Sequence, residues 1–241
     1  MPPTPTHRTA RQRARAEITL AIKDEARHQL AVQGATALSL RAVARELGMV
    51  SSALYRYFPS RDDLLTALII DAYDGLGATV EAAVRPDDPA RAQWRAASHA
   101  VRDWARAHPH EYLLLYGSPV PGYRAPQDTI RPGGRVPTAL VEILARAAAR
   151  GEVAAQAPDE PAVPDELLTQ LATITTVVGV EVPAPLLAKG LAAWTQLFGM
   201  VGFELTGQFA GTLEPADAFV SHTIERMADF VGLAGERRNG G

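Results

Sequence analysis

The first regular spacing of apolar residues lies between Arg8 and Gln33 and predicts a helix. Apolar side chains recur there about every four positions, so they form one stripe on a helical surface. Gly34 follows directly, as expected for the residue just past a helix end. The stripe consists of Ile18, Ile22, Ala26 and Leu30.

Two shorter helical segments follow, and they form a pair. Ser39 is placed to cap a helix of about two turns that ends at Gly48. A second segment covers Ser51 to Phe58 and is stopped by Pro59. Two short helices joined by a tight turn that contains glycine, braced by longer helices, predict a helix-turn-helix.

The rest of the chain is predicted to be helical as well. The sequence 60–63 has the spacing of a capping box, with Asp63 where Glu is usual, and it begins a long helix that reaches about Val84. Pro and Gly are concentrated in 117–137 and 151–164, which are predicted loops, and no segment alternates like a strand. We therefore expect an all-α fold with a C-terminal helical bundle. Its further helices are predicted at about 89–107, 109–116, 134–150, 164–180, 184–208 and 215–233, the last with Pro215 near its first position.

Composition narrows the class of protein. The chain has 241 residues, 47% of them hydrophobic, which is enough for a sizeable core and excludes disorder throughout. It has no cysteine, which excludes disulfides, thiolate zinc sites and cysteine nucleophiles and permits a reducing cytoplasm. The first fifteen residues lack the apolar segment of a secretory signal, and the apolar runs are too short to span a bilayer. We expect a cytoplasmic protein with no membrane partner.

The charge is unevenly placed along the chain. Residues 1–61 carry ten Lys and Arg against four Asp and Glu, a net charge of +6, whereas residues 62–241 carry fourteen against twenty-three, a net charge of −9. A basic head favours an anionic partner, because neutralised phosphates release counterions. An ordinary solvated charged face is the alternative.

The paired short helices carry a recognisable sequence. The string LRAVARELG at 40–48, followed by ALYRYFPSRDDLL at 53–65, closely resembles the DNA-binding domain of the tetracycline-repressor (TetR) family. The resemblance covers about residues 10–68 and is specific in its spacing. It implies an all-helical protomer, not an enzyme, that binds double-stranded DNA at a palindromic operator as a homodimer and answers to a small ligand, with no cofactor.

This resemblance implies a domain layout. We expect a helix-turn-helix DNA-binding domain with a basic N-terminal arm at 1–60, a connecting helix at 61–84, a ligand-binding and dimerisation domain at 85–234, and a disordered tail at 235–241.

Around His108–Tyr123 and Trp194–Gly199 the body resembles a branch of the family with a Trp-His-Gly signature. Phe198 stands where that signature has His, and an aromatic side chain of similar size preserves packing.

The expected DNA contacts follow from the helix-turn-helix. Ser51 and Ser52 lie at the start of the second short helix, where side chains reach base edges, while Tyr57 and Arg61 are placed for phosphates. Val50 stands where the family usually has a Ser or Thr cap; Val cannot cap, so we expect Ser51 to take that role and shift the helix start by one residue. The candidate DNA-binding residues are Ser39, Arg41, Ser51, Ser52, Tyr55, Tyr57, Arg61, Arg13 and Arg15, with Arg8 and Arg11 as further members of the arm.

The body offers candidate residues for a small apolar or aromatic ligand. Those in the predicted helix at about 89–107 follow a three-to-four spacing that faces inward, the others are placed to join them around a cavity with Tyr123 as its gate, and pockets between bundled helices are usual places for such ligands. An ordinary packed core is the alternative, and it would suit a constitutive DNA-binding regulator or a scaffold protein. The candidates are Trp94, Val101, Trp104, Tyr112, Tyr116, Tyr123, Leu140, Leu144, Ile174 and Val178.

Dimerisation is predicted through the last two helices, which would form a four-helix interface with a second copy. The alternative is that both helices close the protomer core. The candidates are Leu187, Leu191, Phe198, Leu205, Phe219, Ile224, Met227 and Val231.

The sequence gives little support to a metal site or to an enzyme active site. His99, His108 and His110 lack the spacing of a metal site, so capping or solvation is favoured and no metal is expected. An enzyme on a helical bundle would need convergent titratable residues in a cavity, and the sequence shows none.

Overall fold

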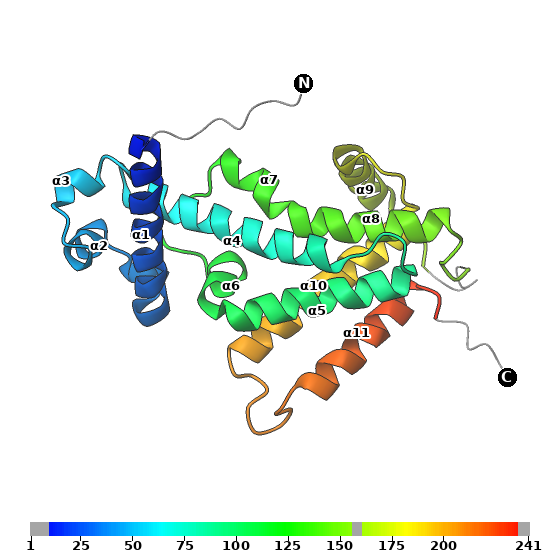
Figure 1. Ribbon diagram of the computed structural model, residues 1–241. Helices are drawn as coiled ribbons and strands as arrows, with labels where there is room; N and C mark the ends of the chain where they lie inside the picture. The colour runs from blue at the N-terminus through cyan, green and yellow to red at the C-terminus, as the bar shows by residue number, and fades with distance from the viewer. Residues whose placement is uncertain (1–9, 156–160, 236–241) are drawn as a thin grey trace. The chain divides into compact units, whose positions relative to one another are not determined.

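The computed structural model describes residues 10–155 and 161–235, and these are helical apart from the connecting loops (Figure 1). The one β-type pairing in these ranges is an isolated antiparallel bridge between Val153 and Leu233. The predicted all-α fold is confirmed. The elements are α1 (Ala10–Gln33), η1 (Ala35–Ala37), α2 (Leu40–Glu46), α3 (Ser51–Leu54), α4 (Arg61–Ala83), α5 (Ala90–Ala107), α6 (Pro109–Tyr116), η2 (Gln127–Thr129), α7 (Ile130–Gly133), α8 (Arg135–Ala149), α9 (Asp165–Val178), α10 (Ala184–Leu205) and α11 (Asp217–Val231).

The chain forms two compact units. The first comprises the residues up to Ala72 together with His110–Thr129, so it holds α1 to α3, the first half of α4 and most of α6. The second comprises Tyr73–Pro109 and the residues from Ile130 onward. This division differs from the expected layout, because α4 is shared between the units and residues 110–129 group with the N-terminal helices.

In the first unit, α1 packs against η1 and α2, and α2 packs against α3. Ile22, Ala26 and Leu30 of the expected stripe are buried, while Ile18 at its N-terminal end is exposed. Gly34 has a φ of +79°, the left-handed conformation that ends a helix and that glycine adopts without strain. The apolar stripe of α1 is therefore one wall of a small core.

The helix-turn-helix begins at the predicted cap. The Ser39 hydroxyl accepts the main-chain N–H of Ala42 at 3.4 Å, and the buried Gln29 of α1 accepts the main-chain N–H of Ser39 at 3.5 Å. Gly48 has a φ of +63°, so it permits the turn that leads to α3. Leu54 of α3 is fully buried and fixes this helix on the core.

The predicted capping motif at the start of α4 is confirmed. The main-chain N–H of Asp63 donates to the Ser60 hydroxyl at 3.1 Å, and that hydroxyl donates to the Asp63 carboxylate at 2.7 Å. From this start α4 runs through the first unit and into the second.

In the second unit, α5, α8, α10 and α11 surround a common core. α5 packs against α8, α10 and α11, while α10 also packs against α8, α9 and α11. Trp94, Leu144 and Leu187 are among the largest fully buried side chains. By length and composition α10 could cross a membrane, but 44% of its apolar stretch is buried against the other helices, as in a core helix of a globular protein.

Three expectations about secondary structure were wrong in detail. α3 ends at Leu54 instead of Phe58, and residues 55–57 form a turn. The predicted loop 117–137 contains η2 and α7. α11 begins at Asp217, so Pro215 precedes the helix instead of occupying its first turn. The expected disorder of residues 236–241 and the contacts expected of Arg8 lie outside the described residues.

Candidate nucleic-acid interface

The turn that leads into α3 is followed by Ser51 and Ser52, the residues predicted to reach base edges. Val50 occupies the N-cap of α3 with an extended backbone and makes no side-chain cap, as expected for Val. Ser51 is the first helical residue, so the expectation that Ser51 would cap the helix and shift its start was wrong. Because Leu54 is buried, Ser52 lies on the exposed side of α3, Tyr55 just past its end is also exposed, and Ser51 is half-buried.

Basic and hydroxyl side chains flank this turn. The guanidinium of Arg15 lies over the ring of Tyr57, 5.0 Å from its centre, and also donates to the main-chain oxygen of Arg56 at 3.4 Å. The structure thus brings together Tyr57, a predicted phosphate contact, and Arg15, a predicted DNA-binding residue of the arm. Arg13 on α1 and Arg41 on α2 are exposed, and the Ser39 hydroxyl is held at the start of α2.

Arg61 has a positioning role that the sequence did not reveal. Its Nη2 donates to the main-chain oxygen of Ala35 at 2.8 Å, and its Nε donates to that of Leu38 at 3.2 Å. These bonds tie the start of α4 to the segment that precedes α2. Its phosphate contact stays a prediction, and much of its donor capacity is already used within the protein.

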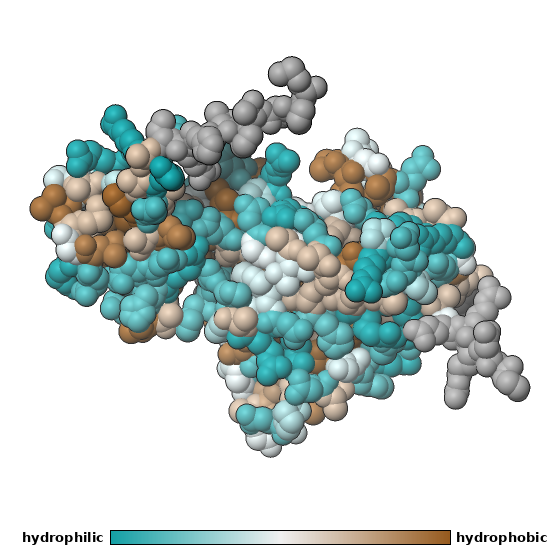
Figure 2. All heavy atoms as spheres, in the orientation of Figure 1, coloured by the Kyte–Doolittle hydropathy of each residue, from teal (hydrophilic) through white to brown (hydrophobic). Residues whose placement is uncertain are grey.

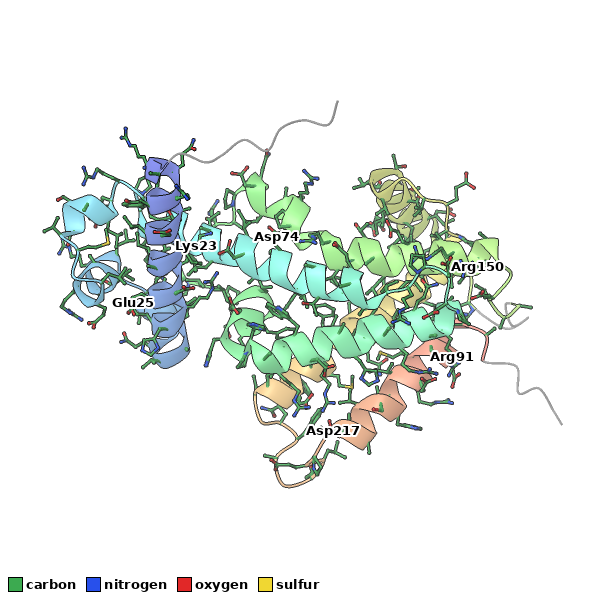
Figure 3. All side chains as sticks on the ribbon, in the orientation of Figure 1. Lys23, Glu25, Asp74, Arg91, Arg150 and Asp217 are labelled. Carbon is green, nitrogen blue, oxygen red and sulfur yellow. The ribbon has the colours of Figure 1, made fainter. Side chains whose placement is uncertain are left out.

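An ion-pair cluster fixes α1 against α4 and α6 within the first unit. Arg27 donates to Asp71 at 2.7 Å, to Glu111 at 3.0 Å and to Asp24 at 2.6 Å, and Lys23 donates to Asp71 at 2.8 Å. Figure 3 shows Lys23 on the side of α1 that faces α4. The helix that braces the helix-turn-helix is therefore held by charged groups from α4 and α6.

The ligand candidates of the first unit surround α6. Tyr112 is fully buried, and burial raises the pKa of its phenol well above the usual range, so it is neutral. Its ring lies 5.1 Å from that of Tyr116, centre to centre. The hydroxyl of Tyr123 lies 2.9 Å from that of Thr66 on α4, so this loop residue is held against α4 by a hydrogen bond.

The ligand candidates of the second unit lie on α5, α8 and α9. Trp94, Val101 and Trp104 are buried on α5, and Trp104 stacks on His108 with ring centres 4.8 Å apart. Leu140 and Leu144 of α8 face α10, where they line a small void of about 10 Å³. The other lining residues of this void are Pro137, Val141, Leu187, Gly190, Leu191 and Trp194.

Ile174 and Val178 do not join the expected core. Leu171 is the buried residue of α9, whereas Ile174 and Val178 are only partly covered, because α9 lies on the outer side of α10 and buries one face of limited width. Trp194 and Phe198 of the Trp-His-Gly-like segment pack together with ring centres 5.7 Å apart.

Two buried polar groups of α5 find no hydrogen-bond partner among the described residues. They are the indole N–H of Trp94 and the hydroxyl of Ser98, one helical turn apart and both fully buried. A buried donor without an acceptor is unfavourable by roughly 1–3 kcal/mol, so such groups usually meet water or a ligand.

Most of the predicted dimer residues are used inside the protomer. Leu187, Phe198, Ile224, Met227 and Val231 are buried within the single chain, so the expectation that they face a partner was wrong. They belong to the stripe that closes the protomer core. Leu191, Leu205 and Phe219 are half-buried.

The exposed aromatic surface lies at the other side of α10. Phe203 has 59% of its surface exposed. Its ring lies 6.5 Å from that of Phe209, which lies 5.4 Å from that of Phe219, so the three form a chain of edge-to-face contacts. Phe203 lies five residues beyond Phe198 along α10 and therefore on another face, so it was not part of the predicted interface stripe.

No group of three or more potential metal ligands occurs among the described residues. His108 ends α5, and its Nδ1 lies 3.0 Å from the main-chain oxygen of Trp104. This contact agrees with the capping role that the sequence favoured for this histidine.

Known proteins resemble both parts of the chain. A family described as bacterial regulatory proteins, tetR family, matches residues 22–68, and a tetracyclin repressor-like C-terminal domain matches residues 94–227. The HTH-type transcriptional regulators Rv1816 of Mycobacterium tuberculosis and Mb1846 of Mycobacterium bovis are each 39% identical over 220 residues, which cover 88% of this chain and 92% of the relative.

Solved structures share the fold. The crystal structure of SCO4313, which its description assigns as a regulatory protein, superposes with a TM-score of 0.75 at 32% identity and covers 92% of this chain and 100% of that one. The TetR family regulator PfmR from Thermus thermophilus superposes with a TM-score of 0.54 at 22% identity, covering 90% of this chain and 99% of PfmR. The chain belongs to the TetR family of bacterial transcriptional regulators.

Proposed function

We propose that this regulator is a repressor that binds a palindromic operator as a homodimer in the cytoplasm and is released by a small apolar or aromatic molecule. The observation that carries the DNA-binding part is the exposed surface of α3, flanked by Arg15, Tyr57 and Arg41. A second helix of this kind enters the major groove by its N-terminal residues, while flanking basic and hydroxyl groups hold the phosphates.

The net charge of the head supports the same surface. Residues 1–61 carry +6 on a chain of −3, so non-specific attraction to DNA is concentrated at the helix-turn-helix. A homodimer doubles this surface and presents two copies of α3 about one turn of DNA apart, which is why the operator is expected to be palindromic.

The experiment that tests this proposal is selection of bound fragments from the source genome with the purified full chain. We expect enrichment of fragments with one inverted repeat, and an affinity that falls steeply as salt increases. Uniform recovery of all fragments would contradict sequence-specific regulation. The genes beside the enriched repeats then indicate the class of ligand to be tried.

The dimer surface that we propose is centred on the exposed Phe203 and on the half-buried Phe209 and Phe219 that continue its chain of ring contacts. Gly199 lies one turn before Phe203 on the exposed side of α10, and a side chain built there would meet nothing within 4 Å. An exposed aromatic cluster beside a bare stretch of helix favours close packing of a second copy about a two-fold axis.

Replacing Phe203 with Lys should convert the dimer to a monomer at micromolar concentration and weaken operator binding by at least tenfold, since a charge would be buried at the centre of the interface. Sedimentation equilibrium and a binding titration measure the two effects. Val177→Lys on α9 is the control, because Val177 is 81% exposed and lies outside the cluster. A Phe203→Lys chain that remains dimeric would exclude this surface.

The ligand-binding part of the proposal is supported by the buried donors of α5. Trp94 and Ser98 present a fully buried N–H and O–H one turn apart, which suits a largely apolar molecule with a hydrogen-bond acceptor. A constitutive regulator without a ligand is the alternative, and in such a protein neither buried donor would have a ligand to bind.

Ser98→Ala should stabilise the ligand-free protein by about 1 kcal/mol, because it removes a buried hydroxyl without a partner. If Ser98 serves a ligand, the same variant should resist release from the operator by the hydrophobic small-molecule fraction of the source cells. Urea unfolding and operator titrations measure the two effects. Ser221→Ala on the exposed side of α11 is the control. A loss of stability in Ser98→Ala would show that the hydroxyl has a structural partner.

A further inference from the structure

We propose that Val50 recognises the 5-methyl group of a thymine in the operator. This inference rests on the proposed function and names one base contact of the same surface. Val50 is 69% exposed, although burial of a valine side chain normally stabilises a protein by about 1.5–3 kcal/mol. Exposed apolar residues are common on protein surfaces, so exposure alone does not indicate a binding role for Val50. Its place in the helix-turn-helix does.

Val50 stands at the entrance to α3, where no structural role uses its side chain. It precedes the first helical residue and makes no side-chain hydrogen bond to the helix. Among the residues that follow it, Leu54 provides the contact with the core. The valine side chain therefore contributes neither to capping nor to the packing of α3.

The backbone around Val50 is fixed, so the direction of its side chain is fixed too. Its main-chain oxygen accepts the N–H groups of Ala53 at 2.9 Å and Leu54 at 3.4 Å. The preceding residue is also held, because the N–H of Met49 donates to the oxygen of Ala44 at 2.8 Å. A β-branched side chain on a fixed backbone has few rotamers, so little conformational entropy is lost on binding.

The surroundings select DNA as the partner of this valine. The exposed residues near it in the helix-turn-helix are Ser52 on α3, Arg41 on α2 and Tyr55, whose ring carries a hydroxyl, and Figure 2 shows hydrophobic spheres mixed with hydrophilic ones over α2 and α3. A protein or lipid partner would require a continuous apolar patch. In the major groove, thymine alone presents an apolar group, its 5-methyl, among hydrogen-bonding atoms.

The test replaces each operator thymine in turn by deoxyuridine, which lacks only that methyl group. At one position per half-site, deoxyuridine should weaken binding of the unaltered chain by about fourfold, the effect of exposing one methylene-sized group. Val50→Ala alters both protomers of the homodimer, so on thymine DNA it should lose about that factor at each half-site, roughly 16-fold in all, and become insensitive to deoxyuridine at that position. Val50→Thr, which keeps one methyl group, should retain part of the discrimination.

Val32→Ala is the matched control, since this valine on α1 is 65% exposed and lies outside the helix-turn-helix. It should discriminate thymine from deoxyuridine as the unaltered chain does. If the unaltered chain binds its operator but Val50→Ala keeps the same sensitivity at every thymine, the inference about Val50 is wrong while the proposed function stands. If the unaltered chain selects no operator, the proposed function itself fails.

Discussion

Replacing Arg102 with Ala is expected to destabilise the second unit by about 3–5 kcal/mol, the range found when one partner of a buried ion pair is removed. The Arg102 side chain is only 5% exposed. Its Nε and Nη2 donate to the two carboxylate oxygens of Glu204 at 2.8 and 2.6 Å, and its Nη1 donates to Asp217 at 2.8 Å. One guanidinium thus joins α5 to the end of α10 and the start of α11.

The expected loss comes from what the substitution leaves behind. Glu204 is largely covered and would be left without its partner, which is unfavourable for a buried charged group. Hydrogen bonding from Arg102 also lowers the pKa of the Asp217 carboxyl, so that carboxylate is held charged at the start of α11. Figure 3 shows Asp217 at this position. Urea unfolding followed by circular dichroism measures the change.

Arg106 provides the matched control. It contacts the same Asp217 at 3.4 Å but is about half exposed, so Arg106→Ala should change the stability by less than about 1 kcal/mol. Arg102→Met, which keeps the length of the side chain but not the charge, should be destabilised nearly as much as Arg102→Ala. Equal and small effects at Arg102 and Arg106 would show that the buried pair contributes no more than a surface pair.

The sequence predicted most helices because their ends carry local signals. Ser39 and Ser60 mark helix starts through their own hydroxyl groups, and Gly34 and Gly48 mark helix ends through a left-handed backbone. Such signals act within four residues, so they are readable without tertiary structure. The length of α3 was not readable in this way: residues 55–57, which were predicted as helix, form a turn that leads to the buried Phe58.

The sites were less predictable, because they depend on which helix faces which neighbour. Leu187 and Phe198 fit an interface stripe as well as a core stripe, and only packing against α8 and α11 decides that they are core. From the sequence, every donor of Arg61 is available to a phosphate. In the structure two of them donate to main-chain oxygens. The sequence shows that Val50 cannot cap a helix, but its exposure depends on the tertiary structure.

Tertiary contact also decides the expected effect of Gly77→Ala, which should be destabilising by about 1–3 kcal/mol although alanine normally favours a helix over glycine. Gly77 lies in the second half of α4, beneath Arg135 of α8. A methyl group added there would lie 2.8 Å from both Cβ and Nε of Arg135. The arginine cannot move away freely, because its Nη1 donates to the Asp74 carboxylate at 2.9 Å and its Nε donates to Glu81 at 2.8 Å.

The contact therefore fixes how α8 approaches α4. Asp74 and Glu81 lie on either side of Gly77 along the helix, and Figure 3 shows Asp74 on the side of α4 that faces α7 and α8. Hydrogen bonding from Arg135 lowers the pKa of Glu81, which keeps this carboxylate charged. These pairs are partly exposed, so their own contribution to stability is modest. The larger effect of Gly77→Ala should come from the steric conflict.

A double-mutant cycle isolates that conflict. Arg135→Gly removes every Arg135 atom that the added methyl group would meet, so in this background Gly77→Ala should stabilise the protein by about 0.5–1 kcal/mol, the ordinary preference of a helix for alanine. Urea unfolding of the four chains gives the coupling free energy. A change of sign between the two backgrounds would show that close approach of Arg135, and not helix propensity, requires glycine at position 77. The same destabilisation in both backgrounds would place the cause elsewhere on α4.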